Sequence, residues 1–187
     1  GKQFHIGTHE RSDLTEAYQD TLAKWNLFLF DGFGSFDPDN IISRIRYLAA
    51  GLDCRVVFLD HLSILLSGLD GDERKMIDNT MTKLRSLCEE TGISMFLVSH
   101  LRRAQGDKGH EDGAKVSLGQ LRGSHSISQI SDAVIGLERD QQSGDEHADT
   151  TVRVLKNRFT GETGVACQLK YDKEKCKFYE SKSFDPQ

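Results

Sequence analysis

The stretch "RVVFLDHLS" (Arg55–Ser63) sets four apolar residues directly before an acid and a histidine. An uninterrupted apolar run of this kind is typical of a strand that is covered on both faces in a parallel sheet. Asp60 would then lie at the carboxyl end of that strand, which is where α/β sheets place their ligands. The stretch therefore predicts an α/β fold with a ligand site beside Asp60.

The bulk composition is that of one ordinary globular domain. A chain of 187 residues with 37% hydrophobic and 28% charged residues can bury one substantial core. The formal net charge of -5 argues against a protein that coats nucleic acid indiscriminately, so any such contact must be local. The four cysteines form no C-x-x-C pair, which indicates reduced thiols in a cytosol-like compartment. No apolar run approaches the roughly 20 residues that cross a bilayer, and no secretory signal is evident, so we expect no membrane partner.

Helices and strands alternate at first, and strands alone follow. Periodicity predicts a helix over residues 13–25, a second that begins with Asp37 as N-cap and Pro38 at its first position, and a third that ends before Gly92. Strands are expected at residues 26–30, 55–60 and 93–100, and later at 133–139, 150–159, 164–171 and 175–180. This order predicts a mainly parallel sheet with flanking helices, extended by antiparallel strands at the carboxyl end.

Two neighbouring strands are expected to bring polar groups to one edge of the sheet. The run "VVFLD" has the form of a Walker B strand, which holds a carboxylate beside nucleotide-bound magnesium. A turn-capping aspartate is the alternative for Asp60, and a packed or capping histidine is the alternative for the adjacent His61. The next strand ends at His100, which could bond a terminal phosphate or serve as a structural histidine. Asp60 is the candidate magnesium ligand, through water, and His61 joins it as a candidate nucleotide contact.

The segment from Leu101 to about Ser124 is rich in glycine and charge and has no helical or strand period. Basic side chains on a glycine-rich loop suit a phosphate backbone, because such a loop can approach closely and follow it. A solvated surface loop is the alternative. The absence of interleaved aromatic residues predicts no base stacking. The basic candidates in this loop are Arg102, Arg103, Lys108, Lys115 and Arg122.

Lys156 and Arg158 stand two residues apart on an expected strand, just before a tight turn in "LKNRFTGETG". Their spacing places both side chains on one face. Two cations aimed one way form an anion clamp, which is the geometry that an arginine finger needs. A cross-strand salt-bridge pair is the alternative.

Five segments, taken in order, resemble the RecA-like motor domain of hexameric replicative DNA helicases, the DnaB and Twinkle family. They are "VVFLDHLSILLSG", "DERKMIDNTMTKLRSLCEETGI", "SHLRR", "LRGSHSISQISDAVIGLERDQQ" and "VLKNRFTGETG". The likeness covers roughly residues 25 to 180 and is nearer to phage bifunctional primase-helicases than to bacterial DnaB or mitochondrial Twinkle. The linked order of the segments is far more specific than any one of them.

The resemblance implies a role for each matching residue. Asp60 matches the Walker B acid, and His100 matches the histidine that senses the terminal phosphate of ATP and couples it to DNA. Arg158 matches the arginine finger and Lys156 the lysine near it, both acting on ATP bound by the neighbouring subunit. The residues implied on the DNA side are Arg102, Lys108, Arg122 and Gln129.

The resemblance also implies cofactors and partners. The cofactors are Mg²⁺ and ATP or another nucleoside triphosphate. The partners are single-stranded DNA, further copies of the chain in a homohexamer or similar ring, and a primase and DNA polymerase of the replisome. The implied location is the cytoplasm of a bacterium or of a phage-infected cell.

The sequence departs from the family pattern in two ways. Gly106 stands where close relatives tend to carry lysine, and Ser128 where they tend to carry arginine, so the grip on DNA is expected to differ. The chain also has no G-x-x-x-x-G-K-[ST], the loop that cradles phosphates, and Glu10 is a poor candidate for the catalytic glutamate. We therefore expect residues 1–187 to be a partial motor domain whose phosphate-binding loop and catalytic glutamate lie upstream.

Three functions follow from these patterns. The first is part of an ATP-dependent ring helicase that translocates on single-stranded DNA and unwinds duplex, with this fragment inactive alone. The second is a complete, non-catalytic RecA-like module that binds DNA or a helicase ring. A recombinase or clock-type ATPase of the same fold is the third, and the "LRGSHSISQ" and "KNRFTG" stretches favour the helicases over it.

Overall fold

The computed structural model describes residues 10–30, 37–65, 71–102, 109–121, 125–142 and 149–183. Its helices are α1 (Arg11–Asp20), α2 (Pro38–Leu52), α3 (Glu73–Thr91) and α4 (His125–Ile130), with short 3₁₀ turns η1 (Leu22–Lys24), η2 (Leu62–Leu65) and η3 (Leu118–Gln120). Its strands are β1 (Val56–Leu59), β2 (Ser94–Leu97), β3 (Ala133–Glu138), β4 (Thr150–Asn157), β5 (Gly164–Asp172) and β6 (Lys177–Ser183).

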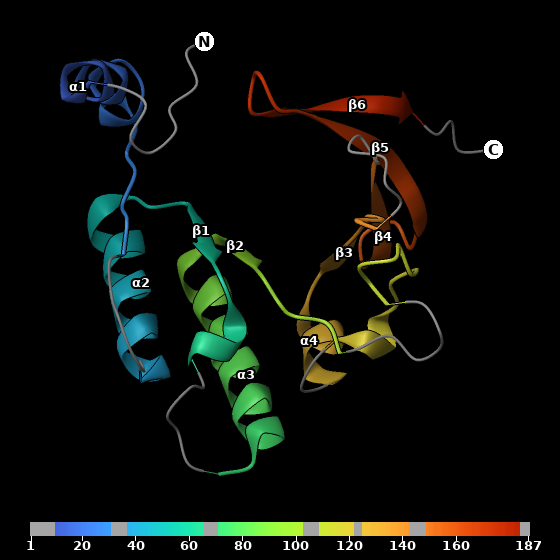
Figure 1. Cartoon of the computed structure of the whole chain (residues 1–187). Helices are drawn as coiled ribbons and strands as arrows, with labels where there is room; N and C mark the ends of the chain where they lie inside the picture. The colour runs from blue at the N-terminus through green and yellow to red at the C-terminus, as the bar shows by residue number, and fades with distance from the viewer. Residues whose placement is uncertain are drawn as a thin grey trace.

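The strands form two separate sheets. β1 and β2 pair in parallel, whereas β3, β4, β5 and β6 form an antiparallel sheet in that order. Figure 1 shows the parallel pair with α2 and α3 in one part of the molecule and the antiparallel sheet with α4 in the other. The expected α/β class, with parallel strands, flanking helices and antiparallel strands at the carboxyl end, is confirmed, although the parallel part of the described chain is small.

The ends of α2 and α3 follow from local chemistry. Asp37 accepts a hydrogen bond from the Asp39 N–H and caps α2, and Pro38 occupies the first turn, as predicted. Asp72 caps α3 in the same way through the Arg74 N–H. α3 ends at Gly92, whose φ of 73° is a left-handed conformation that glycine adopts without steric cost.

One hydrophobic core joins the two parts, and α3 lies at its centre. α3 packs against α2 on one side and against α4 on another. The buried face of α3 is therefore anchored in the core. The buried residues of this core are Ile41, Ile42, Ile45, Leu62, Leu65, Ile77, Met81, Leu84, Leu87, Ile93, Leu121 and Ile127.

The expectation that β1 is covered on both faces is wrong for the described residues. Val57 and Leu59 pack against the core, but Val56 is 48% and Phe58 is 75% exposed. The α2 and α3 helices cover only one face of the pair, and no other described element packs on the outer face. Among the described residues, the apolar run therefore forms a strand with one face packed on the core and apolar side chains exposed on the other.

The strand expected at residues 26–30 does not form. A strand requires a partner ladder, and this segment instead lies beside the end of α2, where the Asn26 side chain donates a hydrogen bond to the Leu52 carbonyl at 3.0 Å. The helix expected at residues 13–25 begins two residues earlier and is shorter. α1 covers Arg11–Asp20, after Glu10 and without a side-chain cap, and the 3₁₀ turn η1 follows. α1 has no buried residue, and Figure 1 shows it apart from both sheets.

The segment before η3 packs closely against the antiparallel sheet at Gly136. A Cβ at Gly136 would lie 3.2 Å from the Val116 Cγ2 and 3.3 Å from the Leu155 Cδ1, so a larger residue would push this segment away from the sheet. Among the described residues, no helix has both the length and the apolar character that crossing a membrane requires.

Candidate functional site

The carboxyl ends of β1 and β2 meet, as their order in the sequence predicted. Leu59 pairs with Leu97, and the Val98 N–H donates to the Leu59 carbonyl at 2.9 Å. Directly beyond this pair, the rings of His61 and His100 contact edge to face with centroids 4.2 Å apart. Asp60 lies between Leu59 and His61, so the carboxylate and both imidazoles occur at one edge of the parallel pair.

The three side chains of this edge differ in exposure. Asp60 and His100 are exposed, whereas His61 is half-buried. The His61 Nδ1 is buried and has no hydrogen-bond partner among the described residues. His61 is therefore a packed histidine with one nitrogen unsatisfied, while Asp60 and His100 present their polar groups to solvent and to any ligand.

Asp60 fits the role of one magnesium ligand. Mg²⁺ keeps several water ligands and is otherwise held by one or two carboxylates and by substrate phosphates. An exposed carboxylate at a strand end meets that need without further protein ligands. In the part of the chain that the structure describes, no three His, Cys, Asp or Glu side chains gather as a metal cage. Any magnesium held here would share its coordination with water and phosphate.

The basic loop after β2 is tied down at its described ends. The Arg102 N–H donates to the Gln120 carbonyl at 2.7 Å, and an antiparallel bridge joins Leu101 to Leu121. The His110 Nε2 donates to the Arg102 carbonyl at 2.9 Å, with a tautomer that places the proton there. The two ends of the loop are therefore hydrogen-bonded to each other. Arg103, Lys108 and Arg122 lie outside the described residues.

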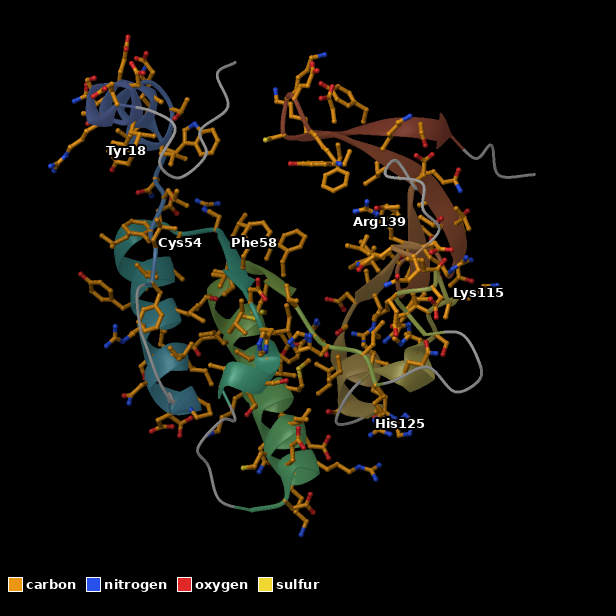
Figure 2. The ribbon with its side chains drawn as sticks, viewed as in Figure 1. Tyr18, Cys54, Phe58, Lys115, His125 and Arg139 are labelled. Atoms are coloured by element: carbon orange, nitrogen blue, oxygen red, sulfur yellow. The ribbon has the colours of Figure 1, made fainter. Side chains whose placement is uncertain are left out.

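Lys115 lies in the second described part of this loop, residues 109–121, which we call the return arm. Its side chain is exposed, and Figure 2 shows it beside the four-stranded sheet. The next residue, Val116, donates its N–H to the Glu138 Oε1 at 2.8 Å, and Arg153 donates two hydrogen bonds to the Glu138 carboxylate at 2.7 and 2.9 Å. These contacts attach the return arm to the sheet.

Glu138 is electrostatically matched to this position. The hydrogen bonds from Arg153 lower the pKa of the Glu138 carboxyl, burial opposes this shift, and the Val116 N–H and the charges of Arg153 and Lys115 add to the lowering. The Glu138 and Arg153 side chains are only 9% and 16% exposed. Glu138 is therefore a charged anchor beneath the loop, and the sequence did not single it out.

Gln129 lies on α4, between the loop and β3. Its side chain is exposed, while its backbone carbonyl accepts hydrogen bonds from Lys156 at 3.0 Å and Arg158 at 2.9 Å. Ser128, the departure from the family pattern, donates its hydroxyl to the His125 carbonyl of the same helix at 2.8 Å. α4 thus presents the Gln129 side chain outward and its last carbonyls to β4.

Lys156 and Arg158 both reach the carboxyl-terminal end of α4, which agrees with the predicted common face. The Lys156 Nζ donates to the carbonyls of Ser128, Gln129 and Ser131 at 2.7, 3.0 and 2.8 Å. An ammonium has three N–H groups, so these acceptors use all of them. In this conformation Lys156 is a clamp on the helix end, where positive charge is favoured, and has no N–H to offer an anion.

Arg158 is held less completely. Its Nη1 donates to the Asp132 Oδ1 at 2.9 Å, and its side chain remains 45% exposed. The salt-bridge alternative is therefore correct in part, because Arg158 has an acidic partner, although Asp132 precedes β3 and the pair is not a simple cross-strand one. Asp132 and its second partner, Arg85, were missed by the sequence reasoning, since no spacing rule connects them.

Comparisons with known proteins show the family of the chain. A sequence model of the family described as "DnaB-like helicase C terminal domain" matches residues 2–180. A DNA helicase/primase of Enterobacteria phage T3 is 41% identical over 166 residues, which are 88% of this chain and 29% of that protein. A replicative DNA helicase DnaB of Mycobacterium intracellulare is 30% identical over 136 residues, which are 69% of this chain and 23% of that protein. The chain thus spans less than a third of either relative.

Solved structures show the same fold. One solved ATPase domain superposes with a TM-score of 0.70 at 22% identity, and the match covers 92% of this chain and 61% of that one. A KaiC-like protein from the hyperthermophilic archaeon Pyrococcus horikoshii superposes with a TM-score of 0.57 at 15% identity, and the match covers 94% of this chain and 72% of that one. The fold is RecA-like.

Proposed function

Because this chain belongs to the DnaB-like helicase C-terminal domain family, we propose that it forms part of the ATP-driven motor of a ring-shaped replicative DNA helicase. The intact protein translocates on single-stranded DNA and unwinds duplex at the fork. The observation that carries the proposal is the meeting of Asp60, His61 and His100 at one edge of the parallel pair. In P-loop NTPases a carboxylate holds the Mg²⁺ of the nucleotide, and Asp60 at the end of β1 suits that role.

The exposed side chains at that edge, Asp60 and His100, form the nucleotide site. Asp60 binds magnesium through water, and His100 donates a hydrogen bond to the terminal phosphate of ATP or another nucleoside triphosphate. Mg²⁺, when bound, supplies positive charge that stabilises the phosphate oxygens. His61 contacts the nucleotide site through its packing against His100. Loss of the phosphate changes what His100 contacts. His100 lies just after β2, and the basic loop begins at the next residue.

The basic loop and α4 form the DNA side. The closed base of the loop, at Leu101 and Leu121, supports a segment that follows the phosphate backbone of single-stranded DNA. Arg102 and Lys115 contribute from the described ends, and Gln129 contributes from α4. The remaining contacts are assigned by their place in the same loop, to Arg103, Lys108 and Arg122.

Arg158 acts across a subunit boundary. Its guanidinium is partly exposed and stabilises charge on the transferring phosphoryl group of ATP held by a neighbouring copy. Lys156 supports it by holding the end of α4. This assignment requires a ring, a homohexamer or similar, in which residues 1–187 supply one part of each motor and an upstream segment supplies the phosphate-binding loop. A primase and the DNA polymerase of the replisome are the further partners, in the cytoplasm of a bacterium or phage-infected cell.

The test uses the full-length protein that contains this chain. ATP hydrolysis with Mg²⁺, with and without single-stranded DNA, and displacement of a strand from a forked duplex are measured for the wild type, Arg158→Ala and Arg74→Ala. Arg74 is an exposed arginine in the first turn of α3 and serves as the matched control. We expect Arg158→Ala to lower turnover about 10³-fold or more, with binding of a non-hydrolysable ATP analogue retained.

Mixing Arg158→Ala subunits with Asp60→Ala subunits tests action in trans. Mixed rings should regain turnover that neither variant has alone, because an Asp60→Ala subunit supplies its Arg158 to the intact nucleotide site of an Arg158→Ala neighbour. Undiminished turnover of Arg158→Ala would refute the finger assignment. A full-length protein that binds ATP and DNA but neither hydrolyses nor unwinds would support the non-catalytic module instead.

A further inference from the structure

One carboxylate, that of Asp132, is shared by two arginines from different elements. Arg85 of α3 donates from its Nη1 to the Asp132 Oδ2 at 2.7 Å, and Arg158 donates from its Nη1 to the Oδ1 at 2.9 Å. The backbone adds a third contact, because the Arg158 N–H donates to the Asp132 carbonyl at 2.8 Å. Asp132 therefore lies between the core helix and the residue proposed as the arginine finger.

Arg85 gives this arrangement a fixed base. Its Nε donates to the Glu89 Oε1, one helical turn further along α3, at 2.8 Å. The neighbouring residues Leu84 and Leu87 are 2% and 1% exposed, so this turn of α3 is anchored in the core. A planar guanidinium with two acidic partners has few orientations left. The position of Asp132 is thereby tied to the core.

The Arg158 guanidinium is held on one side and open on the other. It has five N–H groups. The Nη1 contact with Asp132 and the Nη2 contact with the Gln129 carbonyl at 2.9 Å use two of them. A third contact, from Nη2 to the Ile130 carbonyl at 3.5 Å, is at the limit of a hydrogen bond. The remaining N–H groups, on a side chain that is 45% exposed, can reach an incoming phosphate.

We propose that Asp132, held by Arg85, is a positioning residue that aims Arg158 at the phosphate bound by the neighbouring subunit. The inference rests on the proposed function of Arg158. A free arginine would have to order several rotatable bonds when the phosphate arrives. The contacts with Asp132 and with the end of α4 order the side chain beforehand, so the charge is in place before the reaction begins.

The experiment compares variants of the full-length protein. Asp132→Asn keeps the size of the side chain and removes the charge that binds both arginines. We expect turnover to fall by up to about 100-fold, as for a small misplacement of a catalytic group. Affinity for a non-hydrolysable ATP analogue and assembly of the ring should be unchanged. Asp53→Asn is the matched control, because Asp53 also pairs with an arginine, Arg55, at an exposed site on the other part of the chain.

The decisive readout is a double-mutant cycle. If Asp132 acts through Arg158, then Asp132→Asn should cause no further loss of turnover in an Arg158→Ala background. Arg85→Gln should show the same pattern with a smaller effect, and it decides the question if Asp132→Asn does not fold. Asp132→Glu should recover part of the turnover, because the charge is restored at a slightly different distance.

The outcomes separate the two proposals. Wild-type turnover in both Asp132→Asn and Arg85→Gln would overturn the positioning role while leaving Arg158 as the finger. A loss that persists undiminished in the Arg158→Ala background, together with a lower melting temperature, would mean that Asp132 is structural and would also overturn it. Undiminished turnover of Arg158→Ala alone would instead refute the proposed function.

Discussion

His61 packs edge to face against His100, with ring centroids 4.2 Å apart, at the point where β1 and β2 both end. One ring is half-buried and the other exposed, so the pair forms a supported histidine at the edge of the sheet. In the proposed function the exposed His100 ring contacts the phosphate, and the half-buried His61 ring packs against it.

His61→Phe should keep or raise the stability of the chain. The substitution retains an aromatic ring against His100 and removes the buried Nδ1, which has no partner among the described residues. A buried unsatisfied polar atom costs about 1–3 kcal/mol, and the larger ring offsets part of the gain. Urea unfolding of the 187-residue chain measures the change, with the exposed His125→Phe as control. A loss of more than about 1 kcal/mol would mean that His61 has a polar partner.

Lys156→Gln should destabilise the chain by about 1–2 kcal/mol, because positive charge and hydrogen bonds are lost from the carboxyl-terminal end of α4. Three backbone carbonyls, those of Ser128, Gln129 and Ser131, would lose their common donor. Thermal unfolding of the 187-residue chain measures this without any nucleotide. Lys170→Gln, at an exposed position of β5, is the control. Equal stability of the two variants would contradict the clamp.

Glu138→Gln should destabilise the chain by about 1–3 kcal/mol near neutral pH, because the Arg153 charge would remain buried without its partner. The folded-state pKa of Glu138 lies below its ordinary value of 4.5. The stabilisation from the ionised carboxyl is therefore fully present above pH 4.5 and is lost as the pH falls through the folded-state value.

The difference between wild type and Glu138→Gln should accordingly be constant above pH 4.5 and shrink below it. Urea unfolding at a series of pH values measures this. Glu162→Gln, at an exposed turn residue, should show no such pattern. A difference that grew on acidification would reverse the sign of the linkage and contradict the assignment.

The outer face of the parallel pair should bind hydrophobic dyes. Phe58 and Phe96 stack there with centroids 4.8 Å apart and are 75% and 53% exposed. Figure 2 shows Phe58 on the side of β1 that faces away from α2. Exposed apolar patches promote association. The double variant Phe58→Thr with Phe96→Thr should lower dye fluorescence and light scattering of the 187-residue chain, since threonine keeps the preference for strands.

Phe159→Thr is the control for this prediction, because Phe159 is 82% exposed and lies beyond the end of β4. It should change dye binding far less than the double variant. An equal decrease in both would indicate that isolated exposed rings, and not the face of the parallel pair, bind the dye.

Much of the fold could be predicted from local patterns. Asp37 and Pro38 predicted where α2 begins, Gly92 predicted where α3 ends, and the apolar runs predicted six of the strands. Those features depend on neighbours within a few residues, through caps, fixed φ angles and side-chain periods. The meeting of the ends of β1 and β2, where His61 contacts His100, was also predictable, because parallel strands end at one edge.

Local sequence patterns could not predict contacts between segments that lie far apart in the chain. Within the described ranges, residues 26–30 have the composition of a strand but no pairing strand, and Phe58 is apolar but has no helix packed over it. Lys156 suited an anion clamp by spacing, yet the end of α4 takes its N–H groups. Hydrogen bonds and burial require a second group in the right place.

The candidate site, too, has features set by local sequence and features set by tertiary contacts. Residue types and spacing were enough to predict the class of fold and the candidate residues at the strand ends, because these follow from chemistry along one segment. The pairing of Asp132 with both Arg85 and Arg158 joins positions 47 and 26 residues apart. Packing of α3 against α4 and of α4 against β4 brings them together, and no local propensity encodes that distance.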